Sequence, residues 1–143
     1  MNWAIKKILV PTDGSAAALS ALEPATDIAA AHGAQVIGLF AYAPYGAQVE
    51  GAGALEEIER QIGDASLLHM EEIFGRENIS FKKLLLLGNA VDLILETARR
   101  EEVDLIVMGS RGRTLARRIT GSVTAAVVSH APCAVLSVPK KTT

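Results

Sequence analysis

The sequence has few residues of several types, and each shortage excludes a class of protein. The single cysteine, Cys133, excludes an intrachain disulfide and a cysteine-rich metal site. The three histidines stand at no metal-binding spacing, so no metal site is predicted. Aromatic residues make up only 4% of the chain, so aliphatic side chains must build the core. Cys133 lies in an apolar run and is expected to pack there as a small buried side chain.

Long apolar runs and an excess of one charge are also missing. Fourteen basic and sixteen acidic residues leave a formal net charge of −2, which gives no overall attraction to nucleic acid or membranes. No uncharged apolar run approaches the roughly 18 residues of a membrane-spanning helix, and the first residues lack the apolar region of a secretory signal. We therefore expect a soluble cytoplasmic protein, a single domain over residues 1–143, that binds neither nucleic acid nor membrane.

The pattern that is present is an alternation of short apolar runs with longer amphipathic stretches. Strands are predicted within residues 6–14, 34–42, 81–88, 103–109 and 133–139, and helices over residues 15–32, 54–75, 90–101 and 122–130. Several strands are continuously apolar, which is typical of a parallel sheet covered on both faces. Strands alternating with helices predict the α/β class, a doubly wound sheet with right-handed crossovers and helices on both faces.

Each predicted helix has an apolar face or a terminal signal. The first is expected to bury Leu19, Leu22, Ala25 and Ala29, and to be kinked by Pro24 or to carry it on its outer face. In the second, one face carries Leu55, Ile58 and Ile62. The third is expected to begin after the N-cap Asn89 and to turn Val91, Ile94, Leu95 and Ala98 inward.

The segment after the fourth strand has the chemistry of an anion site. Ligands of open α/β sheets bind beyond the carboxyl ends of the strands. Gly109 and Gly112 lack a Cβ atom, so their backbone can reach positive φ and approach a ligand closely. Gly121 and Ser122 open a helix, whose free N–H groups and dipole favour phosphate. The alternative is that Ser122 only caps this helix.

Two further features of the strand ends have alternative interpretations. Arg111, Arg113, Arg117 and Arg118 either screen a polyphosphate or form a solvated charged surface; no aromatic residues lie between them to indicate nucleic-acid binding. Asp13 either accepts a hydrogen bond from a ribose hydroxyl or an adenine amine, or belongs to the turn that caps the first helix together with Ser15. No P-loop and no nucleophile-elbow motif is present, so we predict no catalytic residue.

Three stretches resemble the universal stress protein family: "ILVPTDGS", "VDLIVMGSRGR" and "TGSVTAAVVSHAPCAVLSVP". The resemblance covers essentially the whole chain and is most specific in the last third. It implies a Rossmann-like, five-stranded parallel sheet in the order 3-2-1-4-5. In that order the first and fourth strands are neighbours, so Asp13 and Gly109 would face the same crevice.

One branch of the family binds ATP through a motif of Gly, two residues, Gly, nine residues and then Gly-Ser or Gly-Thr. Gly109, Gly112, Gly121 and Ser122 match its fixed positions. The resemblance implies that ATP, with Mg²⁺, or another adenine nucleotide binds here. It further implies that the glycine amides and Ser122 hold the phosphates, that Asp13 contacts the ribose or adenine, and that Ala41 packs on the adenine. The predicted binding residues are Pro11, Thr12, Asp13, Ala41, Met108, Gly109, Arg111, Gly112, Arg113, Gly121, Ser122 and Val123.

The chain departs from this motif at one point. Eight residues, "RTLARRIT", separate Gly112 from Gly121 where the motif has nine. Eight residues still span up to about 26 Å, so reach is not limiting. In a helical turn, however, the loss of one residue rotates the downstream residues by about 100°. The departure therefore leaves the phosphate end of the site less determined than the nucleoside end.

The family also implies a homodimer formed through the last strand, residues 134–138. This strand is apolar and would lie at a sheet edge, which favours pairing with a second copy, while Pro139, Lys140 and Lys141 limit further extension. We therefore expect a homodimeric, nucleotide-binding regulator of a stress response with unidentified protein partners. The alternatives are a dimeric scaffold that does not bind ATP, and a weak ATPase.

Overall fold

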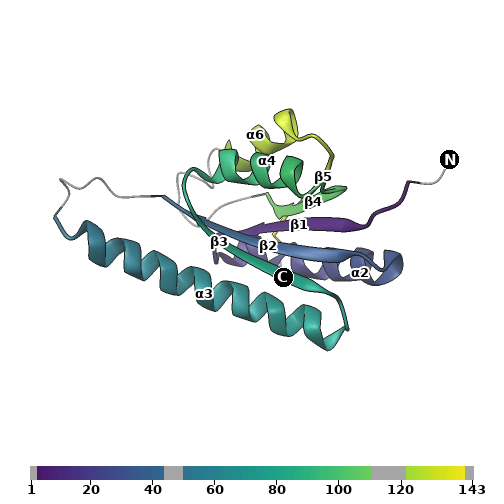
Figure 1. Cartoon of the computed structure of the whole chain (residues 1–143), viewed down its shortest axis with the longest axis horizontal. Coiled ribbons are helices and arrows are strands. Elements are labelled where there is room, and N and C mark those ends of the chain that lie inside the picture. The colour runs from purple at the N-terminus through teal and green to yellow at the C-terminus, as the bar shows by residue number, and fades with distance from the viewer. Residues whose placement is uncertain (1–2, 44–49, 111–121, 141–143) are drawn as a thin grey trace.

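The computed structural model describes residues 3–43, 50–110 and 122–140 of the chain. The described elements alternate along the sequence as predicted (Figure 1). In chain order they are β1 (Lys7–Thr12), α1 (Ala16–Leu19), α2 (Leu22–His32), β2 (Gln35–Tyr42), α3 (Ala52–Arg76), β3 (Phe81–Leu87), α4 (Ala90–Arg100), β4 (Leu105–Gly109), α6 (Ser122–His130) and β5 (Ala134–Val138).

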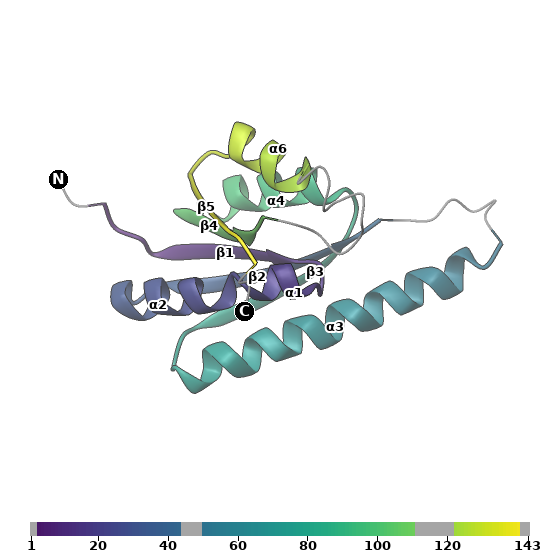
Figure 2. The same ribbon diagram turned by 180° about the vertical axis from the view of Figure 1, so that it is seen from behind.

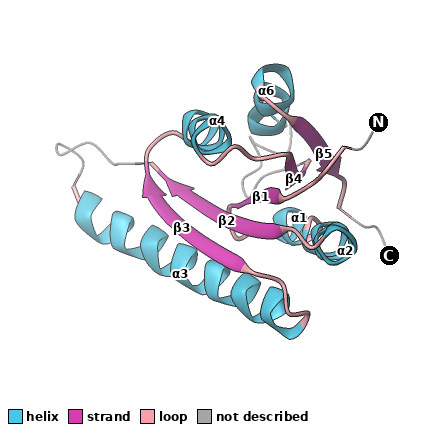
Figure 3. Cartoon of the chain, turned by 45° about the vertical axis from the view of Figure 1, so that its right-hand side comes forward, coloured by secondary structure: helices cyan, strands magenta, loops and turns pink. Residues whose placement is uncertain are grey.

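The five strands form one parallel sheet in the order β3-β2-β1-β4-β5, which confirms the predicted strand order. Helices α1, α2 and α3 lie on one face of the sheet, and α4 and α6 lie on the other (Figures 1 and 3). β1 is central, and β5 and β3 form the edges. The strand order reverses next to β1, because β2 pairs with β1 on one side and β4 pairs with it on the other. In such sheets this switch point is where ligands bind.

Two hydrophobic cores sandwich the sheet, so its central strands are apolar on both sides. In β1, Ile8 and Val10 belong to the core under α2 and α3, whereas Leu9 belongs to the core under α4 and α6. β2 divides in the same way, with Phe40 in the first core and Leu39 in the second. The continuous apolar runs therefore reflect burial on both faces, as predicted.

The first predicted helix is two helices. α1 ends at Leu19 and α2 begins at Leu22, because Pro24 has no N–H to donate to the carbonyl of Ser20. Pro24 instead occupies the first turn of α2, where no intrahelical N–H is required. The break also changes the buried face. Ala25 and its neighbours Leu22 and Ala29 are buried as predicted, but the Leu19 side chain is 44% exposed and not part of the core.

Helix α3 begins two residues before the predicted start and is longer than the sheet it covers. Its N-terminal part extends past the ends of the strands (Figure 2). Leu55 and Ile58, which the spacing placed on one apolar face, are exposed there. The face that packs on the sheet lies further along the helix and consists of Gly63, Leu67, Met70 and Phe74.

Helix α4 follows the sequence signals, whereas the cysteine is less buried than predicted. Asn89 caps α4, its Oδ1 accepting a 3.1 Å hydrogen bond from the N–H of Asp92. Ile94, Leu95 and Ala98 are buried, as predicted. Cys133 is only half-buried, because it precedes the edge strand β5, although its side chain does pack against the α4 and α6 core.

Candidate functional site

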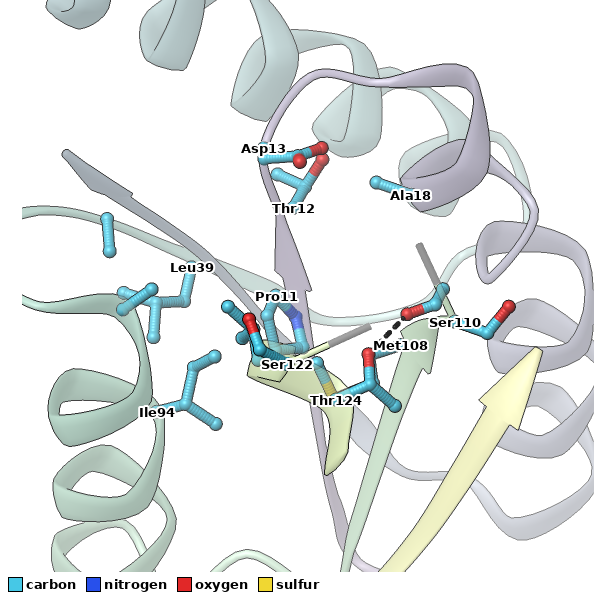
Figure 4. A pocket seen from close by; sticks show the side chains of 14 residues that line it. Pro11, Thr12, Asp13, Ala18, Leu39, Ile94, Met108, Ser110, Ser122 and Thr124 are labelled. Carbon is cyan, nitrogen blue, oxygen red and sulfur yellow. Dashed lines mark hydrogen bonds between the residues drawn. The ribbon is translucent and has the colours of Figure 1, made fainter. Parts of the chain in front are cut away.

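A cleft opens at the carboxyl ends of β1, β2 and β4, facing the first turns of α4 and α6 (Figure 4). It encloses about 660 Å³, including the part open to solvent. Its lining residues are Pro11, Thr12, Asp13, Ala18, Leu39, Ala41, Ala90, Ile94, Met108, Gly109, Ser110, Ser122, Val123 and Thr124. The cleft therefore lies at the switch point of the sheet, where a ligand site is expected.

The lining changes in character around the cleft. Leu39, Ile94 and Met108 are buried apolar side chains, while Ala41 and Ala90 are small and leave space between β2 and α4. Hydroxyl groups come from β1, α6 and the residue after β4, and Asp13 is the only ionisable side chain among the described lining residues. An apolar pocket with a few convergent polar groups is the usual composition of a small-molecule site.

Asp13 lies in the turn that leads from β1 to α1. Its Oδ1 accepts a 2.9 Å hydrogen bond from the N–H of Ser15, and the Ser15 hydroxyl in turn accepts one of 3.0 Å from Ala18 N–H at the start of α1. Gly14 has a φ of 81°, which a residue with a side chain adopts only with strain. The turn role considered for Asp13 and Ser15 is thus confirmed, and the same turn places Asp13 at the cleft.

Gly109 ends β4 and lines the cleft, but for a different reason from the one predicted. Its φ lies outside the positive range, so left-handed backbone is not what requires glycine here. A Cβ atom at this position would collide with the carbonyl group of Ala17 and lie 3.1 Å from Cα of Ala18. Gly109 is therefore required by the close packing of β4 against α1.

Helix α6 provides the wall opposite Asp13. Ser122 begins the helix, lies exposed, and lines the cleft, while Val123 packs against the core under α4 and α6. The Thr124 hydroxyl donates a 2.8 Å hydrogen bond to the carbonyl oxygen of Gly109, drawn as a dashed line in Figure 4. The first turn of α6 is thereby attached to the end of β4.

The structure brings most of the predicted binding residues to this one cleft. The predicted residues that line it are Pro11, Thr12, Asp13, Ala41, Met108, Gly109, Ser122 and Val123. Arg111, Gly112, Arg113 and Gly121 lie outside the described residues, as does the eight-residue segment between the two glycines. The binding roles of all twelve remain predictions.

Sequence reasoning missed six lining residues: Ala18, Leu39, Ala90, Ile94, Ser110 and Thr124. Ala90 and Ile94 stand four apart on α4, directly after the third strand, so the strand-end rule combined with helical spacing would have found them. Ala18 had no comparable signal, because it reaches the cleft only through the turn and short helix that come after β1.

The described residues hold no metal cluster and no membrane-spanning helix. Over residues 3–43, 50–110 and 122–140, no group of three or more His, Cys, Asp or Glu side chains is arranged to hold a metal ion. Over the same ranges, no helix has the length and apolar character needed to cross a membrane.

Comparison with known proteins identifies the family. The model of the universal stress protein family matches residues 4–139. A universal stress protein of Methanocaldococcus jannaschii is 34% identical over 94% of this chain and 82% of its own, and one of Thermus aquaticus is 35% identical over 93% and 98%. A universal stress protein crystallised in complex with cAMP superposes with a TM-score of 0.77 and 30% identity, covering 96% of this chain and 99% of its own. The chain therefore belongs to the universal stress protein family.

Proposed function

We propose that the cleft binds an adenine nucleotide, with ATP and Mg²⁺ as the principal candidate, and that the protein is a homodimeric regulator of a stress response. The observation that carries the proposal is the position of Asp13 and Ser122 on opposite sides of one cleft at the switch point. A relative of 30% identity that was crystallised with cAMP supports an adenine nucleotide as the ligand class.

The nucleoside would occupy the apolar half of the cleft. Leu39, Ile94 and Met108 offer flat or flexible apolar surface for a purine ring, and the small side chains of Ala41 and Ala90 leave room for it. Asp13 lies at the polar border of this half, where a carboxylate suits the hydroxyl groups of a ribose.

The phosphates would lie toward α6. The first N–H groups of a helix have no intrahelical acceptor, and the helix dipole is positive at this end, so both favour an anion. Ser122 adds a hydroxyl group, and no acidic residue lies in the first turn of α6 to oppose phosphate. Mg²⁺, when bound with ATP, would supply further neutralisation of the phosphate charge.

Isothermal titration calorimetry with Mg-ATP tests this proposal. We expect binding of micromolar or weaker affinity, reduced by Ala41→Leu, which fills the space beside the predicted base. The matched control is Ala30→Leu on the exposed side of α2, which should bind like the wild type. The proposal would be overturned if the wild-type protein gave no heat of binding and no shift of its thermal midpoint at millimolar ATP.

A dimeric scaffold without ATP is the second candidate, and the eight-residue spacing between Gly112 and Gly121 favours it. Acid extraction of protein purified from cells separates the two, because a nucleotide regulator releases an adenine nucleotide and an empty scaffold does not. For a weak ATPase, hydrolysis should be lost in Asp13→Ala; hydrolysis that persists would belong to a contaminant.

The homodimer would form along β5. This strand is a sheet edge, and its central residue Leu136 is 37% exposed although it is apolar. Leu136→Lys would place two like charges in a two-fold interface and should produce monomers in sedimentation velocity. Leu68→Lys, at an exposed position of α3 near the opposite edge, is the matched control and should sediment like the wild type.

A further inference from the structure

The hydrogen bond from Thr124 to Gly109 joins two segments that are fifteen positions apart in the chain. It runs from the first turn of α6 to the end of β4, and both residues line the cleft. The side chain of Thr124 is partly shielded, so the bond competes less with water than one on the open surface. Its position makes it a connection between two walls of the site.

The acceptor end of this bond is firmly held. Gly109 pairs with Val138 in the β4–β5 ladder, and the next N–H, that of Ser110, donates a 3.0 Å hydrogen bond to the Val138 carbonyl. On the other side, the backbone of Ala17 packs so closely that Gly109 has no room for a Cβ atom. The carbonyl of Gly109 is thus a fixed reference point in the sheet.

Helix α6 has a second attachment one turn further along. Val127 is fully buried in the core under α4 and α6, and it anchors the middle of the nine-residue helix. Val123 also packs against this core, but apolar packing has little directionality, so it restrains the orientation of a short helix less than a hydrogen bond does. Thr124 supplies a directional attachment at the end that carries Ser122.

We propose that Thr124 is a positioning residue for the phosphate end of the site. Its hydroxyl fixes the first turn of α6 relative to β4, and so holds Ser122 and the backbone of that turn at the cleft. This inference rests on the proposed function. It further predicts that only the phosphate end depends on this hydrogen bond. The nucleoside half consists of residues of β1, β2 and α4 together with Met108 of β4, and none of these side chains takes part in the bond.

The test compares Thr124→Val, which keeps the shape and removes the hydroxyl, with Thr124→Ser, which retains it. Ser129→Ala is the matched control, because the Ser129 hydroxyl donates to a backbone oxygen within the same helix, at an exposed position away from the cleft. Calorimetry with Mg-ATP and an NMR titration with adenosine measure the two halves of the site separately.

We expect Thr124→Val to weaken ATP binding about three- to tenfold, the range of one lost hydrogen bond, while the affinity for adenosine changes less than twofold. Thr124→Ser should restore ATP binding, and Ser129→Ala should bind like the wild type. Thr124→Ala removes the hydroxyl and the methyl group and so introduces no steric clash. It should behave like Thr124→Val, and it takes the place of that variant if Thr124→Val does not fold.

Three outcomes would overturn the inference: unchanged ATP affinity in Thr124→Val or Thr124→Ala, equal loss of ATP and adenosine, or no recovery in Thr124→Ser. They are distinguishable from failure of the proposed function, which would appear as absence of nucleotide binding in the wild-type protein. Melting midpoints measured without ligand show whether a variant has lost stability as well as affinity.

Discussion

Replacing Gly109 by alanine is expected to destabilise the protein even without any ligand. An ideal Cβ atom at this position would lie 2.8 Å from the carbonyl carbon of Ala17 and 3.1 Å from Cα of Ala18, and closer still to the Ala17 oxygen. These neighbours are backbone atoms of a capped helix, so they cannot move aside as the end of a flexible side chain would. Either β4 or α1 must shift.

The size of the effect is set by two opposing contributions. Forcing an extra methyl group into a packed region costs about 1–3 kcal/mol. Alanine also lowers the conformational entropy of the unfolded chain relative to glycine, which stabilises the folded state by about 0.4–1 kcal/mol. We expect a net loss of about 1–2 kcal/mol in the free energy of unfolding. In a chain of this size that lowers the melting midpoint by roughly 3–7 °C.

Urea denaturation followed by circular dichroism, in the absence of nucleotide, measures this change. Gly75→Ala is the matched control, because Gly75 lies in the last turn of α3 and a Cβ atom there meets nothing within 4 Å. It should be at least as stable as the wild type, by up to about 1 kcal/mol. A Gly109→Ala variant as stable as Gly75→Ala would refute the packing explanation for Gly109.

Three further predictions concern the rest of the fold. Asn89→Ala should cost about 1 kcal/mol in urea denaturation because α4 loses its N-cap, and Asn89→Asp should not. The hydrogen bond from Lys82 lowers the pKa of Glu101 in the folded protein. The bond therefore stabilises the protein at pH values above the unfolded pKa of Glu101, and this stabilisation is lost as the pH falls through the folded pKa. Lys82→Met should raise that pKa in an NMR titration while costing less than about 1 kcal/mol, as the Lys82 side chain is about half exposed; an unchanged pKa would contradict the assignment. Burial raises the pKa of the Cys133 thiol in the folded protein. The stability linked to this shift is fully present below the unfolded pKa of the thiol and is lost as the pH rises through its folded pKa. Alkylation by iodoacetamide should therefore need a higher pH in the folded than in the urea-unfolded protein, and coincident profiles would count against this.

The element types could be predicted because their physical causes are local. Continuous apolar runs indicated strands buried on both sides, and Asn89 marked the start of α4. The order of the strands came from the resemblance to a family and not from periodicity, which does not specify which strands pair. Pro24 indicated an irregularity between α1 and α2. Whether a proline kinks a helix or lies in the first turn of a new one depends on what the preceding turn packs against, and the sequence does not specify this.

The site was predictable only to the extent that it lies at strand ends. Asp13 and Ser122 were found because they come directly after β1 and at the start of α6. The packing role of Gly109 depends on contact with α1, whose position no spacing in the sequence specifies. Ala18 likewise lines the cleft only because of the turn and the short helix that follow β1, and no spacing in the sequence indicates this.

Mapping ATP binding by two-dimensional NMR tests most directly whether the cleft is a nucleotide site. Titration of the ¹⁵N-labelled protein with Mg-ATP should shift the amide resonances of residues that line the cleft, including Asp13, Ala41 and Ser122. Resonances of the exposed N-terminal part of α3, such as that of Ile58, should stay in place. Absence of shifts at millimolar ATP, or shifts centred on α3 instead of the cleft, would contradict the proposed nucleotide site.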